Sequence, residues 1–583
     1  MNGSPFPKFK QTIGDIRRFR TVVTVLFEEG FSFLVDEMHL RYLVPLRSRM
    51  KYSLKKGART GVRAVGIRVR EVPPEVRLRC VLERLGPAFM KLGQLLSVRP
   101  DIVPPEFVLE LSKLQDRGPT LMPGVAEKIV EAELGISIEN VFATFDEKPL
   151  AAASLAQVHC AELRDGTPVA VKVRRPRIEE TVVNDIHILA YMAQLMEKHI
   201  RSSRRYRPMR VVREFADWTM RELDFEIEGA HIDMFRNSFV DMPEVVVPKV
   251  YWDYVGPSVL VTDLVQGLRV NDMKALDEAG VDKRKLARIG LRAGIRQFLI
   301  DGFFHADPHP GNLTVLPAEP PKKEGEEGVP LRLGLYDFGM IGRISDKHRF
   351  ELIGCFVSFL ERDLDGYIKH ILDLSKKEED ADIKTFHSEA RTILEGVLYK
   401  PIEKNSMSKS LYRVLISGAN YGIIFPTDLV LLAKAFVTIE NNVLQLFPDI
   451  DIEKEMRPFL AEVIKEEFSP RQVVANLKTS AFDSLYFMRH LPEQTQALFE
   501  RLEKGEIGVK LNLQELRDLK EEFDRQNDVR VLALLAASLL IASAAVMRID
   551  QKAVALGVSV GELGLIIALV AVVWLFVLIR RRP

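Results

Sequence analysis

The sequence has little cysteine, and what it has is scattered. Three cysteines occur among 583 residues, and Cys80, Cys160 and Cys355 lie far apart along the chain. They form no CxxC pair, which excludes a disulfide framework and a thiolate zinc site and favours a reducing compartment. A chain of this length exceeds one ordinary hydrophobic core, so two or three domains are expected.

An excess of one charge sign is also absent. The 82 lysines and arginines nearly balance the 81 aspartates and glutamates. This balance supports neither a nucleic-acid-binding protein nor a disordered acidic chain. The N-terminal stretch MNGSPFPKFKQTIGDIRRFR lacks a continuous apolar core and a small-residue cleavage site, so it is not a secretory signal.

Long charge-free apolar runs occur near the C-terminal end, at 531–547 and 563–579. Each is close to the roughly 20 residues that a helix needs to cross a bilayer. Arg525 and Arg530 precede the first run, and Arg580–Arg582 follow the second. This pattern predicts a transmembrane hairpin with both outer ends in the cytoplasm. The alternative is a pair of buried helices in a soluble core.

The N-terminal part of the chain is expected to be helical. Residues 1–80 are rich in arginine and lysine, with apolar patches such as TVVTVLF. Such a segment could lie on an anionic membrane surface, or it could be the solvated basic face of a docking helix. In 81–117, apolar residues recur at 82, 85, 89, 92 and 96, which predicts one amphipathic helix. Lys91 and Gln94 share another face of it, because they are three positions apart.

The segment 148–175 contains alternating and β-branched residues around Arg164-Asp165-Gly166, which predicts a β-hairpin. Further strands are predicted at 245–254, 258–265, 311–317 and 331–339. From about residue 270 onward the remaining pattern is mostly helical. The order of these elements along the chain is that of a protein-kinase-like bilobal fold: a lysine-bearing hairpin, a helix, two strands, helices, a polar loop and short strands.

A lysine stands in the strand VAVKV, where it is otherwise surrounded by valine and alanine. The ammonium of Lys172 must therefore meet an anion, unless this is an edge strand with a solvent face. In kinase-like sites the strand lysine meets nucleotide phosphates and a helix glutamate. Acidic residues alternate along one predicted helix in RELDFEIEGA at 221–230, although a solvated acidic face is the usual explanation for such a run.

The loop FHADPHPGN (304–312) allows two interpretations. His305, Asp307 and His309 could fold around a metal, but no HExxH or paired-cysteine element supplies further ligands. The loop also aligns without gaps with the kinase catalytic-loop template H-R-D-L-x-x-x-N. That alignment places Asp307 as the base and Asn312 as a magnesium ligand. The following DFG then supplies Asp337, and the ordered set favours the catalytic loop.

Two features of ordinary protein kinases are missing. The phosphate-cradling loop is normally rich in glycine, but here it is AAASLAQVH, with no glycine from Leu150 to His159. No A-P-E follows the DFG, so the usual peptide-docking segment is absent. Both departures argue against a protein substrate.

These motifs together resemble the UbiB family of atypical kinases, called ADCK or Coq-type in eukaryotes, over roughly residues 80–345. KLGQ (91–94) resembles the KxGQ motif of the family, and ELD (222–224) resembles its ExD motif. The alanine-rich loop, VAVKV, FHADPHPGN and DFG agree as well. Small departures are Gly229, where the family usually has alanine, and VTDLVQG, which lacks the usual Met-Glu of the hinge.

The resemblance implies roles for individual residues. The KxGQ extension would fold over the site and block protein substrates, with Lys91 and Gln94 lying against Glu222 and Asp224 as regulatory residues. Lys172 would pair with Glu228. Asp307 would be catalytic, and Asn312 and Asp337 would bind Mg²⁺. The residues expected to bind ATP (or ADP) are Leu150, Ala151, Ala152, Ala153, Ser154, Leu155, Ala156, Gln157, Val158 and Lys172.

The expected protein is a membrane-anchored atypical kinase or ATPase that supports ubiquinone biosynthesis. The family is associated with ATPase activity stimulated by membrane lipid. Expected partners are membrane lipid and quinone-biosynthesis enzymes, with no nucleic acid and no protein substrate. The expected location is the inner membrane of a bacterium, with the catalytic domain in the cytoplasm. Alternatives are an ATP-gated scaffold that presents lipid or quinone precursors, and a kinase of such a precursor.

The expected fold class is α+β, a kinase-like bilobal fold between an N-terminal helical KxGQ extension and a C-terminal transmembrane hairpin. The expected segments are a basic amphipathic helical region at 1–80, the KxGQ extension at 81–147, the N-lobe with its inserted helices at 148–268, the C-lobe at 269–470, a helical linker at 471–528 and the hairpin at 529–583.

Overall fold

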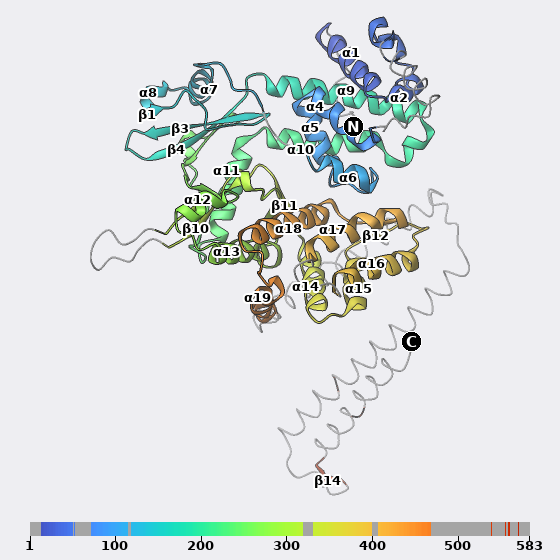
Figure 1. Ribbon diagram of the computed structural model, residues 1–583, viewed down its shortest axis with the longest axis vertical. Coiled ribbons are helices and arrows are strands. Elements are labelled where there is room, and N and C mark those ends of the chain that lie inside the picture. Colours follow the sequence, from blue (N-terminus) through green and yellow to red (C-terminus); the bar gives the residue numbers. More distant parts are fainter. Residues whose placement is uncertain are drawn as a thin grey trace. The chain divides into compact units, whose positions relative to one another are not determined.

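The computed structural model divides the chain into two compact units, Met1–Ser469 and Pro470–Pro583. The structure describes residues 13–50, 52, 72–114, 118–318, 330–398 and 406–467, together with 538, 554–555, 558–559 and 570. The first unit combines sheets with many helices, in agreement with the predicted α+β class (Figure 1). The predicted segment boundaries stay predictions.

A five-stranded antiparallel sheet forms the lobe called here the N-lobe (Figure 1). Its strands are β1 (Phe142–Phe145), β2 (Ala151–Ala152), β3 (Ala156–Leu163), β4 (Pro168–Arg174) and β6 (Val259–Asp263). The predicted hairpin is confirmed, because β3 pairs with β4 and Gly166 takes the positive φ that the turn needs. Val171 and Val173 of β4 are fully buried. Since side chains alternate across a strand, Lys172 faces the opposite side of the sheet.

One predicted strand is wrong over most of its length. Within 245–254, only β5 (Val245–Val246) is a strand, and it belongs to a second sheet with the order β5-β10-β9-β7. Pro248 cannot donate a ladder hydrogen bond, and a 3₁₀ turn follows at Trp252–Tyr254. The remaining strands of this sheet are β7 (Leu268–Arg269), β9 (Leu313–Leu316) and β10 (Arg332–Leu335). The predicted short strand pair is confirmed by the antiparallel pairing of β9 with β10.

A helical layer packs beside the N-lobe around its own hydrophobic core. Its helices are α1 (Ile13–Glu28), α2 (Ser32–Glu37), α4 (Pro74–Leu85), α5 (Pro87–Leu96), α6 (Pro105–Leu111), α9 (Ile178–His199) and α10 (Pro208–Glu222). The single helix predicted through 82–96 is two helices. Gly86 has φ 93°, which ends α4, and Pro87 starts α5 at its first helical position. Two short helices, α7 (Val125–Leu134) and α8 (Ile138–Val141), adjoin the N-lobe sheet.

The acidic run at 221–230 is likewise not one helix. The helix α10 ends at Glu222, and α11 (Phe225–Ser238) begins three residues later. Asp224 is the N-cap of α11, and its side chain accepts a hydrogen bond from Glu226 N. Aspartate at an N-cap satisfies an otherwise unpaired backbone N–H, so this residue starts a new helix rather than continuing the old one.

The C-lobe is mainly helical and shares one large core with the second sheet. Its helices are α12 (Met273–Glu278), α13 (Lys283–Arg296), α14 (Asp346–Leu360), α15 (Leu364–Asp373), α16 (Ile383–Leu398), α17 (Met407–Ser417), α18 (Thr427–Leu446) and α19 (Ile452–Glu467). A π-helical turn, Gln297–Asp301, continues α13. Strand β8 (Phe303–His305) then leads into the FHADPHPGN loop and pairs with β11 (Ile341–Arg343), which follows the DFG.

One helix within the described residues, α18, is long and apolar enough to cross a membrane. However, 61% of that stretch is buried inside the protein, where it packs against α13 and α17, so we assign it to the C-lobe core. The predicted membrane spans at 531–547 and 563–579 lie almost entirely outside the described residues. Between them, β14 (Val554–Ala555) pairs antiparallel with β15 (Val558–Ser559), which reverses the chain direction there.

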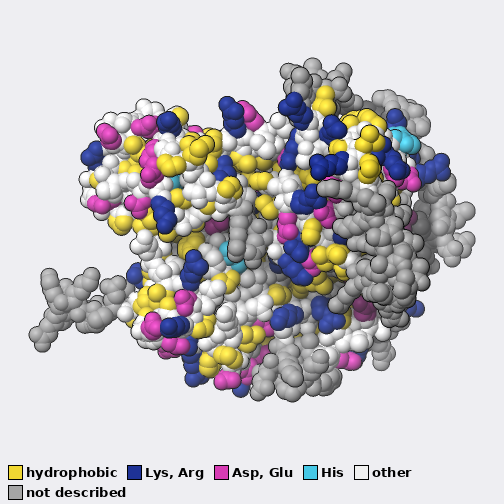
Figure 2. All heavy atoms as spheres, turned by 45° about the horizontal axis from the view of Figure 1, so that its top comes forward, with side chains coloured by type: hydrophobic (Ala, Val, Ile, Leu, Met, Phe, Trp, Pro, Cys, Tyr) yellow, Lys and Arg dark blue, Asp and Glu magenta, His cyan; other side chains and the backbone are white. Residues whose placement is uncertain are grey.

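Exposed apolar side chains gather on the N-terminal helices. Phe33, Tyr42, Leu46 and Met50 are 60–73% exposed within eighteen positions of one another. Figure 2 looks toward the end of the molecule that carries these helices and shows basic and apolar side chains intermingled there. Arginines at 41, 47 and 49 belong to the same stretch.

Candidate active site

Lys172 is the centre of a three-residue ion-pair cluster. Its Nζ lies 2.7 and 2.9 Å from the two carboxylate oxygens of Glu228, on α11. The same atom lies 3.1 Å from Oδ1 of Asp337 of the DFG. The structure therefore joins a strand of the N-lobe, the helix behind it and the loop after β10, although these residues are up to 165 positions apart.

The cluster shifts the proton affinities of its members. Burial alone would lower the pKa of Lys172, but the carboxylates of Asp337 and Glu228 outweigh burial and raise that pKa well above its ordinary value. Lys172 in turn holds the pKa of Asp337 far below its usual range, against the opposing effect of burial. Lys91 lowers the pKa of Asp337 further. Lys172 is thus an ammonium and Asp337 a carboxylate at neutral pH.

The backbone of Asp337 is held in an unusual conformation. Its φ of 62° lies in the left-handed region, which is uncommon for residues other than glycine. The neighbouring Phe338 is fully buried, and its carbonyl oxygen accepts a hydrogen bond from Nδ1 of His231 at 3.1 Å. Such outliers persist only where the surrounding structure fixes them, and they concentrate at functional sites.

The FHADPHPGN loop folds back on itself beside this cluster. His305 Nδ1 accepts from Asp307 N at 3.2 Å, and its Nε2 lies 3.3 Å from the carbonyl of Tyr336. Asn312 Nδ2 donates to the Asp307 carbonyl at 3.1 Å. The Asp307 side chain stays 43% exposed, with His309 Nε2 at 3.8 Å. The carboxylate is therefore open to an incoming substrate, while its backbone is fixed.

The histidine-metal interpretation of this loop is not supported. Nowhere in the described residues do three or more His, Cys, Asp or Glu side chains form a group that could hold a metal. Both ring nitrogens of His305 have hydrogen-bond partners, Asp307 N and the Tyr336 carbonyl, and His309 Nδ1 accepts from Gly311 N at 2.8 Å. These histidines shape the loop instead.

The alanine-rich loop forms a tight turn between β2 and β3. Ala153 N donates to Ala156 O at 2.9 Å, and the Ala153 carbonyl accepts from Arg175 Nε at 3.0 Å. Gly118 lies so close that an added Cβ would be 2.1 Å from the Ala153 carbonyl oxygen. Arg175 and the segment beginning at Gly118 therefore brace the loop from two sides.

Gln157 has a structural task in this loop. Its side chain is buried, with Oε1 accepting from Leu121 N at 3.0 Å and Nε2 lying 2.7 Å from His159 Nε2. His159 Nδ1 donates to the Asp146 carbonyl at 2.7 Å, which fixes the tautomer. The amide of Gln157 thus ties the loop to residues 118–121.

The helix with the KLGQ motif reaches the same site. Lys91 on α5 is buried and forms an ion pair with Glu222 at the end of α10. Glu222 Cγ would lie 3.9 Å from a Cβ built on Gly339, so the pair borders the DFG. Gln94 has a buried side-chain oxygen without a hydrogen-bond partner in the described part of the chain. Asp224 caps α11, and the structure shows no hydrogen bond between it and Gln94.

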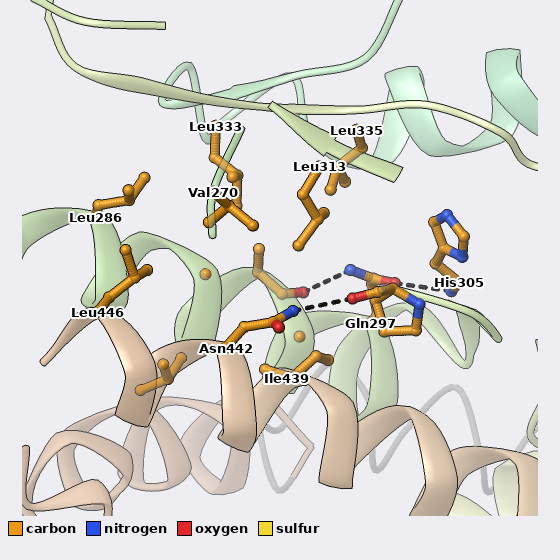
Figure 3. Close-up of a pocket in the computed structure, with 15 residues that line it drawn as sticks. Val270, Leu286, Gln297, His305, Leu313, Leu333, Leu335, Ile439, Asn442 and Leu446 are labelled. Carbon is orange, nitrogen blue, oxygen red and sulfur yellow. Dashed lines mark hydrogen bonds between the residues drawn. The ribbon is translucent and has the colours of Figure 1, made fainter. Parts of the chain in front are cut away.

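A small apolar cavity lies on the other side of the catalytic loop, between α13 and α18 (Figure 3). It encloses about 40 Å³ and is lined mainly by aliphatic side chains such as Leu286, Leu313 and Ile439. Polar groups on its wall reach the loop: Gln297 Oε1 accepts from His305 N at 2.9 Å. Asn442 Nδ2 donates to the carbonyl of Pro308 at 3.0 Å.

Comparison with known proteins identifies the family of this chain. The family model for the ABC1 atypical kinase-like domain matches residues 113–371, the UbiB helical domain matches 390–451, and the ABC1/UbiB kinase-like C-terminal domain matches 514–581. The chain is 34% identical over 432 residues to a "Probable protein kinase UbiB" of Pseudomonas paraeruginosa, covering 74% of this chain and 79% of the relative. The chain belongs to the UbiB family.

Another UbiB relative, from Aeromonas hydrophila, is 30% identical over 539 residues and matches 92% of this chain and 94% of its own. The solved complex of Rv3197 with erythromycin from Mycobacterium tuberculosis is 21% identical, with a TM-score of 0.43, and covers 70% of this chain and 97% of that chain. The match to the family model of the ABC1 atypical kinase-like domain shows that the mixed helix-and-sheet fold is kinase-like.

The site chemistry of this UbiB-family chain fits a magnesium ion. Asp337 is a carboxylate of lowered pKa, and Asn312 donates its amide nitrogen to the Asp307 carbonyl, which leaves its side-chain oxygen to serve as a metal ligand. Magnesium prefers one or two such oxygens together with phosphate oxygens, rather than a cage made wholly of protein ligands.

Gly229, the departure from the usual UbiB alanine, has a local cause. A Cβ at this position would lie 3.1 Å from Cη2 of Trp252, tighter than most real contacts. Trp252 in turn donates from Nε1 to Asp233 at 2.7 Å. Glycine therefore lets α11 approach the tryptophan that follows β5.

Several residues that shape the site were not predicted. Arg175 follows the VAVKV strand without a motif that would reveal its contact with the alanine-rich loop. Arg174 donates to the Leu223 carbonyl at 2.7 Å and so holds the ELD segment. Asn442 lies 134 positions from Pro308, its partner, and no local sequence pattern connects them.

Proposed function

We propose that this UbiB-family protein binds Mg-ATP between its lobes and transfers the γ-phosphoryl group to water or to a small acceptor. The observation that carries the proposal is the ammonium of Lys172, which holds Glu228 and Asp337 within 3.1 Å. In kinase-like sites such a lysine binds nucleotide phosphates, and the helix glutamate keeps it in place.

The residues divide the chemistry between them. Asp307 accepts the proton of the acceptor hydroxyl as the new oxygen–phosphorus bond forms and the bond to the leaving ADP breaks. Asn312 and Asp337 would hold Mg²⁺, which neutralises charge on the phosphates. Lys172 keeps its proton throughout, because its carboxylate partners raise its pKa.

Three features support an acceptor smaller than a protein. The alanine-rich loop has side chains where a glycine-rich loop has none, and no A-P-E segment follows the DFG. The buried ion pair also joins Lys91 of the KLGQ helix to Glu222, which borders Gly339 of the DFG. A docked peptide would need the space beside the DFG that Lys91 and Glu222 occupy.

Membrane anchoring is supported by the sequence of the C-terminal part, and the role in quinone biosynthesis by family membership. The two charge-free runs at 531–547 and 563–579 would anchor the chain in a bacterial inner membrane, with the kinase-like unit in the cytoplasm. Membership of the UbiB family supports a task in ubiquinone biosynthesis. Membrane lipid and quinone-biosynthesis enzymes would then be the partners.

Quinone profiling of a deletion strain tests this function. Plasmid-borne wild-type protein should restore the isoprenoid-quinone level, whereas Lys172→Ala and Asp307→Asn should not, at equal protein abundance. Restoration by Asp307→Asn would end the enzymatic proposal and leave an ATP-gated scaffold. Transfer of label from γ-labelled ATP into extracted lipid would identify the acceptor as a lipid or quinone precursor rather than water.

A further inference from the structure

A segment of dense positive charge joins α9 to α10 in the helical layer. Its sixteen residues, 198–213, read KHIRSSRRYRPMRVVR and contain no acidic residue. Seven of them are cations: Lys198 and the arginines at 201, 204, 205, 207, 210 and 213. The whole chain has a net charge of only +1, so positive charge is concentrated here. None of the motifs of the kinase-like site includes this basic segment.

The structure presents these cations to solvent on a fixed turn. The side chains at 198, 201, 204, 207, 210 and 213 are exposed. The turn is the 3₁₀ helix η2 (Arg201–Tyr206). Inside it Ser203 is buried, and its Oγ donates to the carbonyl of Ile200 at 2.7 Å. Met209 N donates to Glu197 Oε1 at 3.0 Å, which ties the start of α10 to the last turn of α9.

The acidic residues on either side of the basic segment do not neutralise it. Glu197 accepts the backbone hydrogen bond just described, and Glu214 forms an ion pair with Arg99 of the KLGQ region. Among the residues that the structure describes, the six exposed cations form no ion pair. Like charges at this density repel one another, and a bound anion would relieve that repulsion.

Exposed apolar side chains lie next to this charge. The ring of His199 in the basic segment lies 5.0 Å from the ring of His39, edge to face. In the sequence, His39 stands between Phe33 and Tyr42, two members of the exposed apolar group on the N-terminal helices. Tyr206 is itself 48% exposed. The two segments therefore meet, and Figure 2 shows basic and apolar side chains intermingled at this end of the molecule.

We propose that residues 31–50 and 198–213 together form a docking surface for an anionic phospholipid membrane. The arginines would bind headgroup phosphates, and the exposed apolar side chains would enter the boundary between headgroups and acyl chains. A nucleic acid would attract the arginines too, but its phosphate backbone gives Leu46 and Met50 no apolar partner. The inference deepens the lipid-partner part of the proposed function and requires neither phosphoryl transfer nor the C-terminal spans.

The number of exposed cations suits a reversible membrane contact. Each lysine or arginine near an anionic membrane strengthens binding by about fivefold. The attraction acts over a Debye length of about 8 Å at physiological salt. One arginine alone would therefore contribute little, whereas several on one fixed turn, with apolar side chains beside them, give binding that depends on both lipid charge and salt.

Hydrogen exchange of the full-length chain tests the proposal. The chain is incubated, without nucleotide, with vesicles of phosphatidylcholine alone or of phosphatidylcholine mixed with phosphatidylglycerol. With phosphatidylglycerol, backbone amides in 31–50 and 198–213 should exchange slower by about tenfold or more. Raising NaCl to about 0.5 M shortens the Debye length to about 4 Å and should remove most of this protection. Equal exchange with the two kinds of vesicle, or protection unchanged by salt, would overturn the proposal.

Charge-reversal variants locate the surface. The test variant, Arg201→Glu/Arg210→Glu/Arg213→Glu, changes exposed arginines of the basic segment and should lose the phosphatidylglycerol-dependent protection. The matched control changes three exposed cations beside the N-lobe sheet and should keep it: Lys148→Glu/Arg164→Glu/Lys249→Glu. Both variants alter the net charge equally. Equal loss of protection in the two would show a response to net charge alone and would overturn the docking surface.

A third variant and a nucleic-acid probe separate the membrane from other anions. Leu46→Ser/Met50→Ser keeps every arginine and should weaken the protection, because the apolar contact is lost. Binding of a single-stranded RNA by the wild-type chain, without protection by phosphatidylglycerol vesicles, would overturn the proposal in favour of a nucleic acid. Absence of ATP turnover would overturn the proposed phosphoryl transfer and leave the docking surface standing. Absence of lipid protection alone would do the reverse.

Discussion

The ammonium of Lys91 is paired with the carboxylate of Glu222, 131 positions later in the chain, and both side chains are at most 13% exposed. This pair joins the KLGQ helix to the end of α10 at the border of the DFG. A buried charge that loses its partner is costly, whereas replacing both partners by apolar groups costs little.

The first prediction concerns this pair. Lys91→Met should lower the free energy of unfolding by about 3–5 kcal/mol, because Glu222 remains buried without its cation. The double variant Lys91→Met/Glu222→Met should lose much less. Urea titration of the full chain in detergent measures both. Equal losses in the single and double variants would show that the pair contributes packing rather than charge compensation.

The second prediction concerns Lys172. Lys172→Met should weaken Mg-ATP binding by about 10- to 100-fold, the loss expected for one hydrogen bond to a charged group. The matched control is Lys249→Met, an exposed lysine between the strands β5 and β6, which should bind as wild type. Calorimetric titration gives both affinities. Unchanged affinity in Lys172→Met would place the nucleotide elsewhere.

The third prediction is a pH dependence of stability. Burial lowers the pKa of His305 below its ordinary value, so the native ring is neutral. Below a pH of about 6.5 the unfolded chain takes up a proton that the native chain does not. The free energy of unfolding should therefore fall as the pH decreases from about 6.5 and stay level above it.

A matched variant isolates this contribution. In His305→Asn the amide oxygen can take the hydrogen bond from Asp307 N that Nδ1 accepts, and no titrating ring remains. Urea midpoints should depend less on pH in this variant than in wild type. His231 and His348, whose pKa values burial also lowers, should contribute to the dependence that remains. An identical pH slope in His305→Asn would refute the assignment.

The fourth prediction tests the packing beneath the loop with two glycines one turn apart on α13. A Cβ on Gly290 would lie 3.8 Å from Leu333, in ordinary contact at the cavity wall, so Gly290→Ala should stabilise the protein by about 0.5–1 kcal/mol. A Cβ on Gly294 would lie 2.7 Å from Ile439 Cδ1, and this close approach offsets the same helical gain in Gly294→Ala. A higher urea midpoint for Gly294→Ala than for Gly290→Ala would contradict the described packing.

Local patterns predicted the parts of the fold that depend on neighbours in the sequence. The hairpin of β3 and β4 follows from alternation around Gly166, and the pairing of β9 with β10 follows from two short apolar runs. The break between α10 and α11 was missed because Asp224 was assigned to a helix face instead of an N-cap. The strand predicted at 245–254 was wrong beyond Val246 because Pro248 cannot donate a ladder hydrogen bond and a 3₁₀ turn follows at Trp252–Tyr254.

The candidate site likewise has residues that local motifs indicated and contacts that they did not. Ordered motifs indicated Lys172, Asp307 and Asp337, since each motif has a recognisable local sequence. Contacts between distant segments gave no such signal. Arg175 braces the alanine-rich loop from the end of β4, and Asn442 holds Pro308 from a helix that looks like ordinary core.

The most direct test of the account measures Mg-ATP binding and turnover by the wild-type chain and by Asp307→Asn in the same phospholipid vesicles. The carboxylate of Asp307 is 43% exposed, and in the proposed mechanism it serves the acceptor rather than the nucleotide. Asp307→Asn should therefore bind Mg-ATP within about threefold of wild type and lose turnover by about 100-fold or more. Turnover at the wild-type rate in Asp307→Asn would contradict a kinase-like active site in this loop.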